Sequence, residues 1–372
     1  MATSLTQPLD QSIVTTAAAT VSARSGVGAT PNWFASVMGT GIVANAAATL
    51  PLDAPLLAEA ARIVWVVAAL WLALLLVVVL REWAGGAAPH RHLDDPVLGH
   101  FYGAPAMAMM TVGLGALLVG EPVLGRVGAV GTAAVLWTVG TVLGLATAVA
   151  LPVRLFARDN VRSDEAGGPW LMSIVAPMVS AATGPALAAH VTDADARASL
   201  LLLCGALFGA AALAALVTIA MIWSRLAHHG IGAAAAVPTL WIVLGPLGQT
   251  ATAAHAIAAG VADLSPAVAA PARIAGVVIA VPVLGFALLW AAIAAAITVR
   301  AARAGLPFTL AWWSFTFPVG TCATGVAGLA ATLGLPVLTA LAVVLLVILV
   351  LAWAVVAART ALAVRGGTVA LW

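Results

Sequence analysis

The sequence contains no lysine, and charged residues of all kinds make up only 8% of its 372 residues. Soluble proteins carry charge on about a quarter of their residues, whereas 63% of this chain is hydrophobic. A soluble fold would need several large cores with almost no charged shell. The composition therefore excludes an ordinary soluble protein and predicts an integral membrane protein.

Cysteine and recognisable catalytic motifs are also scarce. Cys204 and Cys322 have neither a CxxC partner nor a histidine at ligand spacing, so both are expected to be small buried side chains. The histidines of H-R-H-L-D-D at 90–95 have no fixed ligand spacing, and this stretch is interpreted as a solvated flank. The G-x-S-x-G, H-E-x-x-H, Walker A and dinucleotide-binding motifs are absent. No enzyme activity, metal, cofactor or nucleic-acid partner is indicated.

Long apolar runs, by contrast, fill most of the chain. A transmembrane helix needs about 20 apolar residues, and ten runs of roughly that length predict an all-α membrane domain. The spans lie at 33–50, 56–80, 98–119, 127–151, 169–190, 196–223, 236–260, 272–299, 308–333 and 336–358. We expect residues 1–30 to form a disordered cytoplasmic tail, 31–358 the transport domain and 359–372 a short cytoplasmic tail.

Arginine placement predicts the orientation of these spans, because cytoplasmic flanks retain an excess of positive charge. Eleven arginines fall on one side and four on the other, so both termini are expected to be cytoplasmic. The four on the minority side are Arg62, Arg126, Arg197 and Arg273. The alanine and arginine bias indicates a GC-rich bacterial genome, and hence the bacterial inner membrane.

A proline repeats near the middle of alternate spans. Pro105, Pro177, Pro246 and Pro318 recur at a nearly constant interval along the chain, and this period fits one helical hairpin per unit. The first span has no proline, but its M-G-T-G stretch, with Gly39 and Gly41, lies at the matching position. The repeat predicts five hairpins, in each of which the first helix is kinked.

A proline inside a helix removes a backbone hydrogen bond and costs about 3 kcal/mol. Broken helices are tolerated in a membrane where they face protein or water. We therefore expect the five interrupted helices to form an inner ring around a central pore, shielded by the other five. Because these helices run parallel, their outer halves would all begin near the middle of the membrane, and the partial positive charge and free N–H groups of those N-termini would favour an anion. The alternative is that glycine and proline only improve helix packing.

No acidic residue and no arginine lies well inside a span, which argues against a carboxylate-driven proton antiporter and against cation selectivity. Uncharged polar side chains and one aromatic ring remain as candidates for the pore lining. They are Thr40, Asn45, Phe101, Thr111, Ser173, Ser180, Gln249, Thr250, Ser314 and Thr321. Each polar group could instead bond to a neighbouring helix.

Two phenylalanines and one histidine stand out in the later spans. Phe315 and Phe317 point about 200° apart on one helix, so only one can face a central axis. Phe317, immediately before Pro318, is the candidate gate. His255 lies in the outer half of its span and could titrate near neutral pH, although a packing role is the alternative.

Three stretches resemble the tellurite-resistance and dicarboxylate transporter family, nearest to its malic acid and sulfite branch. They are P-N-W-F-A-S-V-M-G-T-G-I at 31–42, P-V-L-G-H-F-Y-G-A-P at 96–105 and W-W-S-F-T-F-P-V-G-T at 312–321. The resemblance implies a homotrimer with a pore in each protomer, and a gating phenylalanine that corresponds to Phe317. Leu98 departs from the basic residue often found there in the family.

Two functions remain open. The first is a passive pathway for small anions, such as malate, sulfite, tellurite, chloride or nitrate. The second is a proton-coupled carrier of C4-dicarboxylates or sulfite, with coupling through His255 or through the substrate's own proton. A membrane scaffold or receptor would leave the repeated prolines unexplained.

Overall fold

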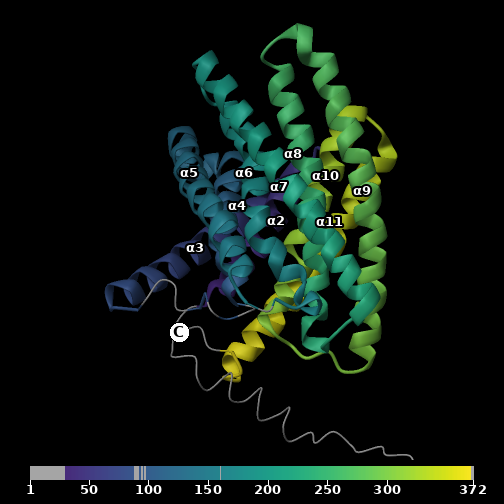
Figure 1. Cartoon of the computed structure of the whole chain (residues 1–372). Coiled ribbons are helices and arrows are strands. Elements are labelled where there is room, and N and C mark those ends of the chain that lie inside the picture. Colours follow the sequence, from purple (N-terminus) through teal and green to yellow (C-terminus); the bar gives the residue numbers. More distant parts are fainter. Residues whose placement is uncertain (1–29, 88–91, 94, 96–97, 160, 370–372) are drawn as a thin grey trace, which may run out of the picture.

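Ten long helices and no strand make up the described part of the chain in this computed structural model, which covers residues 30–87, 92–93, 95, 98–159 and 161–369 (Figure 1). The all-α prediction is confirmed. The helices are α2 (Phe34–Thr49), α3 (Pro55–Ala84), α4 (Ala104–Val119), α5 (Glu121–Phe156), α6 (Leu171–Ala188), α7 (Ala194–His229), α8 (Leu244–Ala262), α9 (Pro266–Arg303), α10 (Phe317–Leu333) and α11 (Pro336–Arg365). The tail predicted at 1–30 lies almost wholly outside the described residues.

The helices fall into two classes by length and burial. In α4, α6, α8 and α10, between 72% and 89% of the most apolar window is buried, compared with 22% to 28% in α3, α5, α7, α9 and α11. Helix α2 has only 16 residues, and its first 14 are buried. The second class exposes apolar side chains over most of its surface, as lipid-facing helices must.

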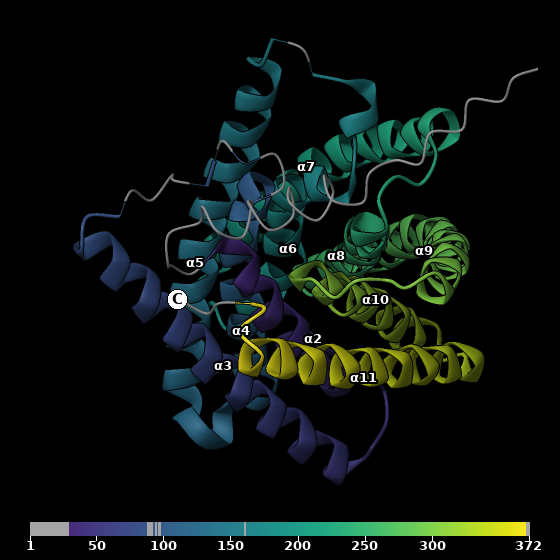
Figure 2. The same cartoon turned by 90° about the horizontal axis from the view of Figure 1, so that it is seen from below.

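The buried helices form a closed ring. Along the ring, α2 contacts α4, α4 contacts α6, α6 contacts α8, α8 contacts α10, and α10 returns to α2. Each is followed in the chain by a long helix that packs against it, so the chain consists of five hairpins. In the view of Figure 2, α3, α5, α7, α9 and α11 lie at the periphery. Because each outer helix returns the chain to the same end, the five inner helices run parallel.

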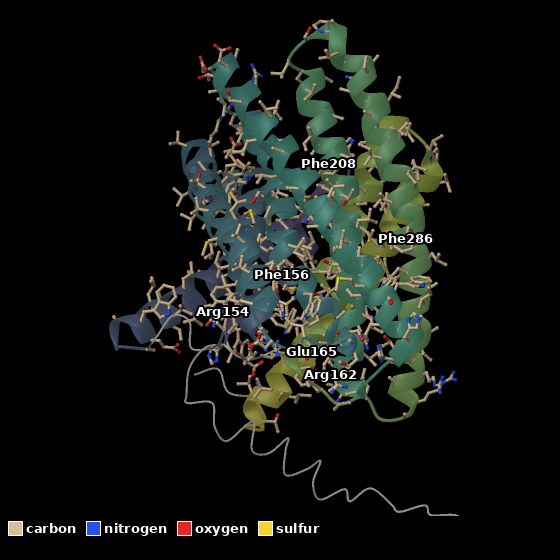
Figure 3. The ribbon with its side chains drawn as sticks, viewed as in Figure 1. Arg154, Phe156, Arg162, Glu165, Phe208 and Phe286 are labelled. Atoms are coloured by element: carbon tan, nitrogen blue, oxygen red, sulfur yellow. The ribbon has the colours of Figure 1, made fainter. Side chains whose placement is uncertain are left out.

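Each inner helix is preceded by a 3-10 segment, and these segments mark one end of the bundle, here named the 3-10 end. The segments are η1 (Pro31–Trp33), η2 (Leu98–Gly103), η4 (Gly168–Trp170), η5 (Ala234–Val243) and η6 (Leu310–Phe315). Another short segment, η3 (Ser163–Glu165), lies in the loop before η4. Figure 3 shows Arg154, Arg162 and Glu165 at this end, and Phe208 and Phe286 along the sides.

Three of the predicted prolines lie where the 3-10 segment becomes an α-helix. Pro105 and Pro318 are the second residues of α4 and α10, and Pro246 is the third residue of α8. A proline is suited to the first helical turn, because the N–H that it lacks has no intrahelical acceptor there. At these positions the proline therefore begins a helix.

The prediction of an interruption was wrong at two of the five positions. Helix α6 continues through Pro177, its seventh residue, and α2 continues through Gly39 and Gly41. The glycines instead allow close packing of neighbouring helices. A Cβ atom on Gly39 would overlap Thr316 of the segment before α10, and one on Gly41 would lie 2.8 Å from Thr111 of α4.

The predicted turn between the last two spans is present, and the last helix is longer than the predicted span. Gly334 adopts a left-handed conformation with φ 65° after α10, and Pro336 begins α11. Helix α11 then continues to Arg365, past the predicted end at 358, because A-A-R-T-A-L-A-V-R contains no helix-breaking residue.

Gly248 provides a direct test of the ring packing. A Cβ atom there would lie 2.5 Å from the backbone nitrogen of Cys322 and from the carbonyl carbon of Thr321. We expect Gly248→Ala to separate α8 from α10 and to reduce the free energy of unfolding by about 1–3 kcal/mol, because the added methyl group overpacks the contact. The melting temperature of the detergent-solubilised protein should fall accordingly.

The matched control is Gly205→Ala on α7, where an added Cβ meets no atom within 4 Å. Its melting temperature should equal or slightly exceed that of the wild type. Equal melting temperatures for the two variants would show that α8 and α10 do not depend on this close approach.

Candidate transport pathway

A small cavity lies where all five inner helices meet, near the 3-10 end. Its volume is about 30 Å³, which is room for roughly two water molecules. Helix α2 contributes Ala35 and Met38 to the lining. Helix α4 contributes Met107, and the 3-10 segment before it contributes Phe101. Helix α6 contributes Met172 and Val175. The α8 region contributes Ile242 and Gly245, and the α10 region Trp313, Ser314, Phe317 and Pro318. The lining is almost wholly apolar, so the cavity has few partners for water.

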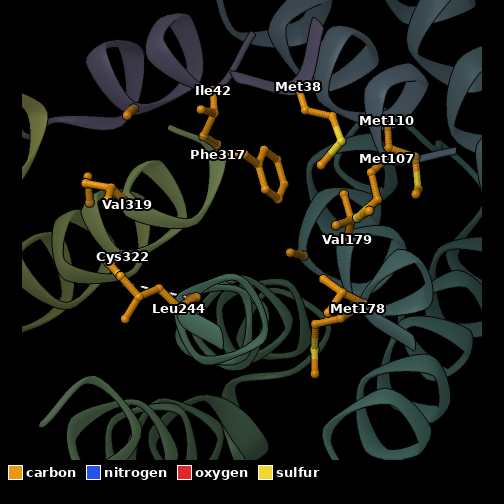
Figure 4. Close-up of a cluster of buried hydrophobic side chains, with 14 of the residues drawn as sticks. Met38, Ile42, Met107, Met110, Met178, Val179, Leu244, Phe317, Val319 and Cys322 are labelled. Atoms are coloured by element: carbon orange, nitrogen blue, oxygen red, sulfur yellow. Dashed lines mark hydrogen bonds between the residues drawn. The ribbon is translucent and has the colours of Figure 1, made fainter. Parts of the chain in front are cut away.

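Phe317 lies at the centre of this arrangement. Its side chain is 5% exposed, and Figure 4 shows the ring directed into the space between the helices that carry Met38, Met107 and Val179. Phe315, two residues earlier, packs its ring edge-to-face against Trp241 and Trp312 instead. The prediction that the two rings point in different directions is confirmed.

The structure places two of the ten predicted lining side chains on this cavity, Phe101 and Ser314, together with the predicted gate Phe317. Most of the other predicted lining residues do not reach it, because their polar groups bond to neighbouring helices. Thr40 accepts a hydrogen bond from Trp353 of the outer helix α11 at 3.1 Å. Asn45 donates from Nδ2 to the carbonyl of Thr111 at 3.0 Å, which joins α2 to α4.

The remaining hydroxyls show the same pattern. Ser180 accepts from Thr141 of the outer helix α5 at 3.0 Å. Thr321 donates to the Pro318 carbonyl at 2.7 Å, with longer contacts to α8 carbonyls. Thr250 bonds to the Pro246 carbonyl at 2.7 Å, and Ser173 is buried. The alternative interpretation, in which these side chains form hydrogen bonds to a neighbouring helix or to a carbonyl of their own helix, therefore holds for most of them.

Within the described part of the chain, the amide oxygens of Gln249 and of Asn45 are both buried without a hydrogen-bond partner, but Gln249 differs from Asn45 in that no other bond holds its side chain. The side chain is 4% exposed. Leaving a buried polar atom unpaired costs about 1–3 kcal/mol, so an amide in the inner ring that forms no hydrogen bond at all needs an explanation.

The methionines of the pathway are not among the predicted lining residues, because polarity was the criterion for that prediction. Met38, Met107 and Met172 line the cavity with Phe317. A signal was available in the spacing, since Ala35 and Met38 are three residues apart, as are Met172 and Val175. Residues three apart share one face of a helix.

His255 lies away from the central axis. Its Nδ1 is 2.8 Å from the hydroxyl of Thr332 on α10, and that hydroxyl also donates to the Gly328 carbonyl. The imidazole borders a separate cavity of about 300 Å³ that Asp263 and Arg273 also line. Three of the six residues of the H-R-H-L-D-D stretch, at 90, 91 and 94, lie outside the described residues.

Comparison with known proteins now identifies the family. The family model described as voltage-dependent anion channel matches residues 28–361, nearly the whole chain. The chain belongs to the voltage-dependent anion channel family. This agrees with the resemblance found in the three sequence stretches, which lie at the starts of α2, α4 and α10.

Relatives of this anion channel family member come from fungi and an archaeon. A sulfite efflux pump of Arthroderma otae is 28% identical over 302 residues, 79% of this chain and 80% of the relative. A sulfite efflux pump of Trichophyton rubrum is 26% identical over 338 residues, 89% of each chain. An uncharacterized transporter of Methanocaldococcus jannaschii is 26% identical over 298 residues, 78% of this chain and 80% of the relative.

These findings support transport of anions across a membrane, by a channel or a transporter. The family and the named relatives are channels and transporters rather than enzymes. A multi-pass membrane location agrees with nine described helices that are long and apolar enough to span a bilayer, and with α2 as a shorter tenth helix.

Thr40 tests whether a buried hydroxyl of the ring serves packing or conduction. Thr40→Val keeps the shape of the side chain but removes the bond from Trp353, so we expect a loss of about 1 kcal/mol in stability. Anion flux into liposomes should stay close to that of the wild type. A large change in flux with unchanged melting temperature would place Thr40 on the pathway.

Proposed function

We propose that each protomer conducts small anions, sulfite and malate among them, passively along the axis of the inner ring, and that Phe317 closes this pathway. The observation that carries the proposal is the cavity to which all five inner helices contribute and into which the Phe317 ring projects. An aromatic ring at an apolar constriction blocks ions by filling space and by excluding water.

The electrostatics of the axis support an anion as the permeating species. The residues that line the cavity include no acidic side chain and no other charged group. Helices α8 and α10 begin at the cavity, since Gly245 and Pro318 lie in their first turns. The N-terminus of a helix carries a partial positive charge of about half an elementary charge. Such ends attract an anion and repel a cation without placing a full charge in the membrane.

The proposal also covers the orientation of the protein in the membrane, the identity of that membrane and the oligomeric state. The 3-10 end faces the cytoplasm, because Arg154 and Arg162 lie there with most of the other arginines. The membrane is a bacterial inner membrane, as the alanine and arginine bias indicates. The family resemblance adds a homotrimer in which every protomer has its own pathway.

A proton-coupled carrier of sulfite or C4-dicarboxylates is the second candidate function, favoured by the similarity to fungal proteins named sulfite efflux pumps. Coupling through His255 has little support, because the imidazole lies beside Thr332 and away from the axis. Coupling through a proton carried by the substrate itself needs no titrating side chain. Uphill accumulation of sulfite driven by an imposed pH gradient in liposomes would favour this candidate.

Phe317→Ala tests the proposed gate. Removing the ring opens the space between Met38 and Met107, and we expect anion flux to rise by at least about tenfold because the constriction becomes wet. The measurement is voltage-driven chloride or sulfite flux in liposomes that contain equal amounts of folded protein.

Phe315→Ala is the matched control, because it removes an equal ring that packs on Trp241 and Trp312. Its flux should remain at the wild-type level. An unchanged flux in Phe317→Ala, or an equal rise in both variants, would remove Phe317 from the role of gate.

A further inference from the structure

Gln249 lies on the face of α8 that is directed at the axis. Residues four apart share one face of an α-helix, so Gln249 lies on the same face as Gly245, which lines the central cavity. Four residues of helix correspond to a rise of about 6 Å. Gln249 therefore lies about one turn beyond the cavity and the Phe317 ring, toward the end opposite the 3-10 end.

The contacts of α8 support this assignment. Gly248 meets Thr321 and Cys322 of α10. Ala254 and Ala258 lie against Gly276 of the outer helix α9, and the helical repeat places both alanines on the side of α8 opposite Gln249. The glutamine thus points away from α9, toward the inside of the ring.

The amide of Gln249 has no hydrogen bond among the described residues, and its Oε1 is fully buried. The neighbouring hydroxyls on the same part of the ring are all engaged. Thr250 bonds to a carbonyl of its own helix, and Thr252 and Thr324 bond to each other at 2.9 Å. The described residues therefore leave the hydrogen-bonding capacity of the Gln249 amide unused.

The chemistry of a primary amide sets which ligand would satisfy it. The NH₂ group donates two hydrogen bonds and the oxygen accepts. An anion oxygen satisfies the NH₂ group, but the unpaired Oε1 requires a donor. Chloride and nitrate have no donor, whereas a singly protonated oxyanion presents O⁻ and O–H groups side by side.

We propose that Gln249 is a specificity-determining residue that binds singly protonated oxyanions, such as hydrogen sulfite or a monoprotonated dicarboxylate, just beyond the Phe317 constriction. This inference rests on the proposed function, since it requires an anion to travel along the axis. It selects the protonated species over halides, and no side chain of the protein has to change its protonation state.

The test compares hydrogen sulfite flux with chloride flux in the same liposomes, at a pH where most sulfite carries one proton. Gln249→Leu keeps the bulk of the side chain but removes both bonding groups. We expect the ratio of hydrogen sulfite to chloride flux to fall about tenfold, the size of one lost hydrogen bond to an ion. Gln249→Met, an unbranched substitute, provides a second variant if the leucine disturbs folding.

Thr250→Val is the control, because Thr250 is adjacent in sequence but its hydroxyl bonds to the Pro246 carbonyl. The control should keep the wild-type ratio. In the wild type, sulfite flux should also fall relative to chloride flux as the pH rises and hydrogen sulfite loses its proton.

An unchanged ratio in both Gln249 variants would overturn the inference while leaving anion conduction intact. The inference would also be overturned if the sulfite flux of the wild type rose with pH in proportion to the concentration of the sulfite dianion. If the folded wild type and Phe317→Ala conduct no anion at all, the proposed function fails first, and this inference fails with it.

Discussion

The fold depends on one constraint, which is that backbone groups in a bilayer must find their partners inside the protein. The 3-10 segments and prolines at the starts of α4, α8 and α10 leave some of these groups without regular helical partners. Burying these helix starts within a closed ring keeps them out of the hydrocarbon. The five long outer helices expose many large apolar side chains and can meet the lipid.

The ring is held together by close contact rather than by charge. Glycines bring helix backbones together, as Gly248 does between α8 and α10 and Gly320 does against Ile42 of α2. Hydroxyl groups bond across the same seams or within their own helices. What remains at the centre is a small apolar cavity that the Phe317 ring lines. A tightly packed wall around a narrow apolar constriction is the arrangement expected of a closed pathway.

Much of this architecture could be predicted from the sequence, because lipid exposure and helix interruption leave strong patterns. The ten spans, the pairing into hairpins and the opposite directions of Phe315 and Phe317 all follow from apolar length and helical geometry. The polar lining could not be predicted in the same way. A threonine has the same appearance in a sequence whether it faces water or bonds to a carbonyl, and only packing separates Thr40, which meets Trp353, from Ser314, which borders the cavity. Gly39 and Gly41 failed as predicted kinks for a related reason, since glycine serves close packing as well as flexibility.

The central claim is that the inner ring of each protomer encloses the route of the anion. The most direct test is thiol accessibility in Phe317→Ala protein, in which Cys204 and Cys322 are replaced by alanine and one new cysteine is introduced at Ser314 or at Thr40. The account predicts that a water-soluble, negatively charged thiol reagent modifies Ser314→Cys and blocks anion flux, and that Thr40→Cys does not react. Equal reactivity at the two positions, or modification of Ser314→Cys with no loss of flux, would contradict it.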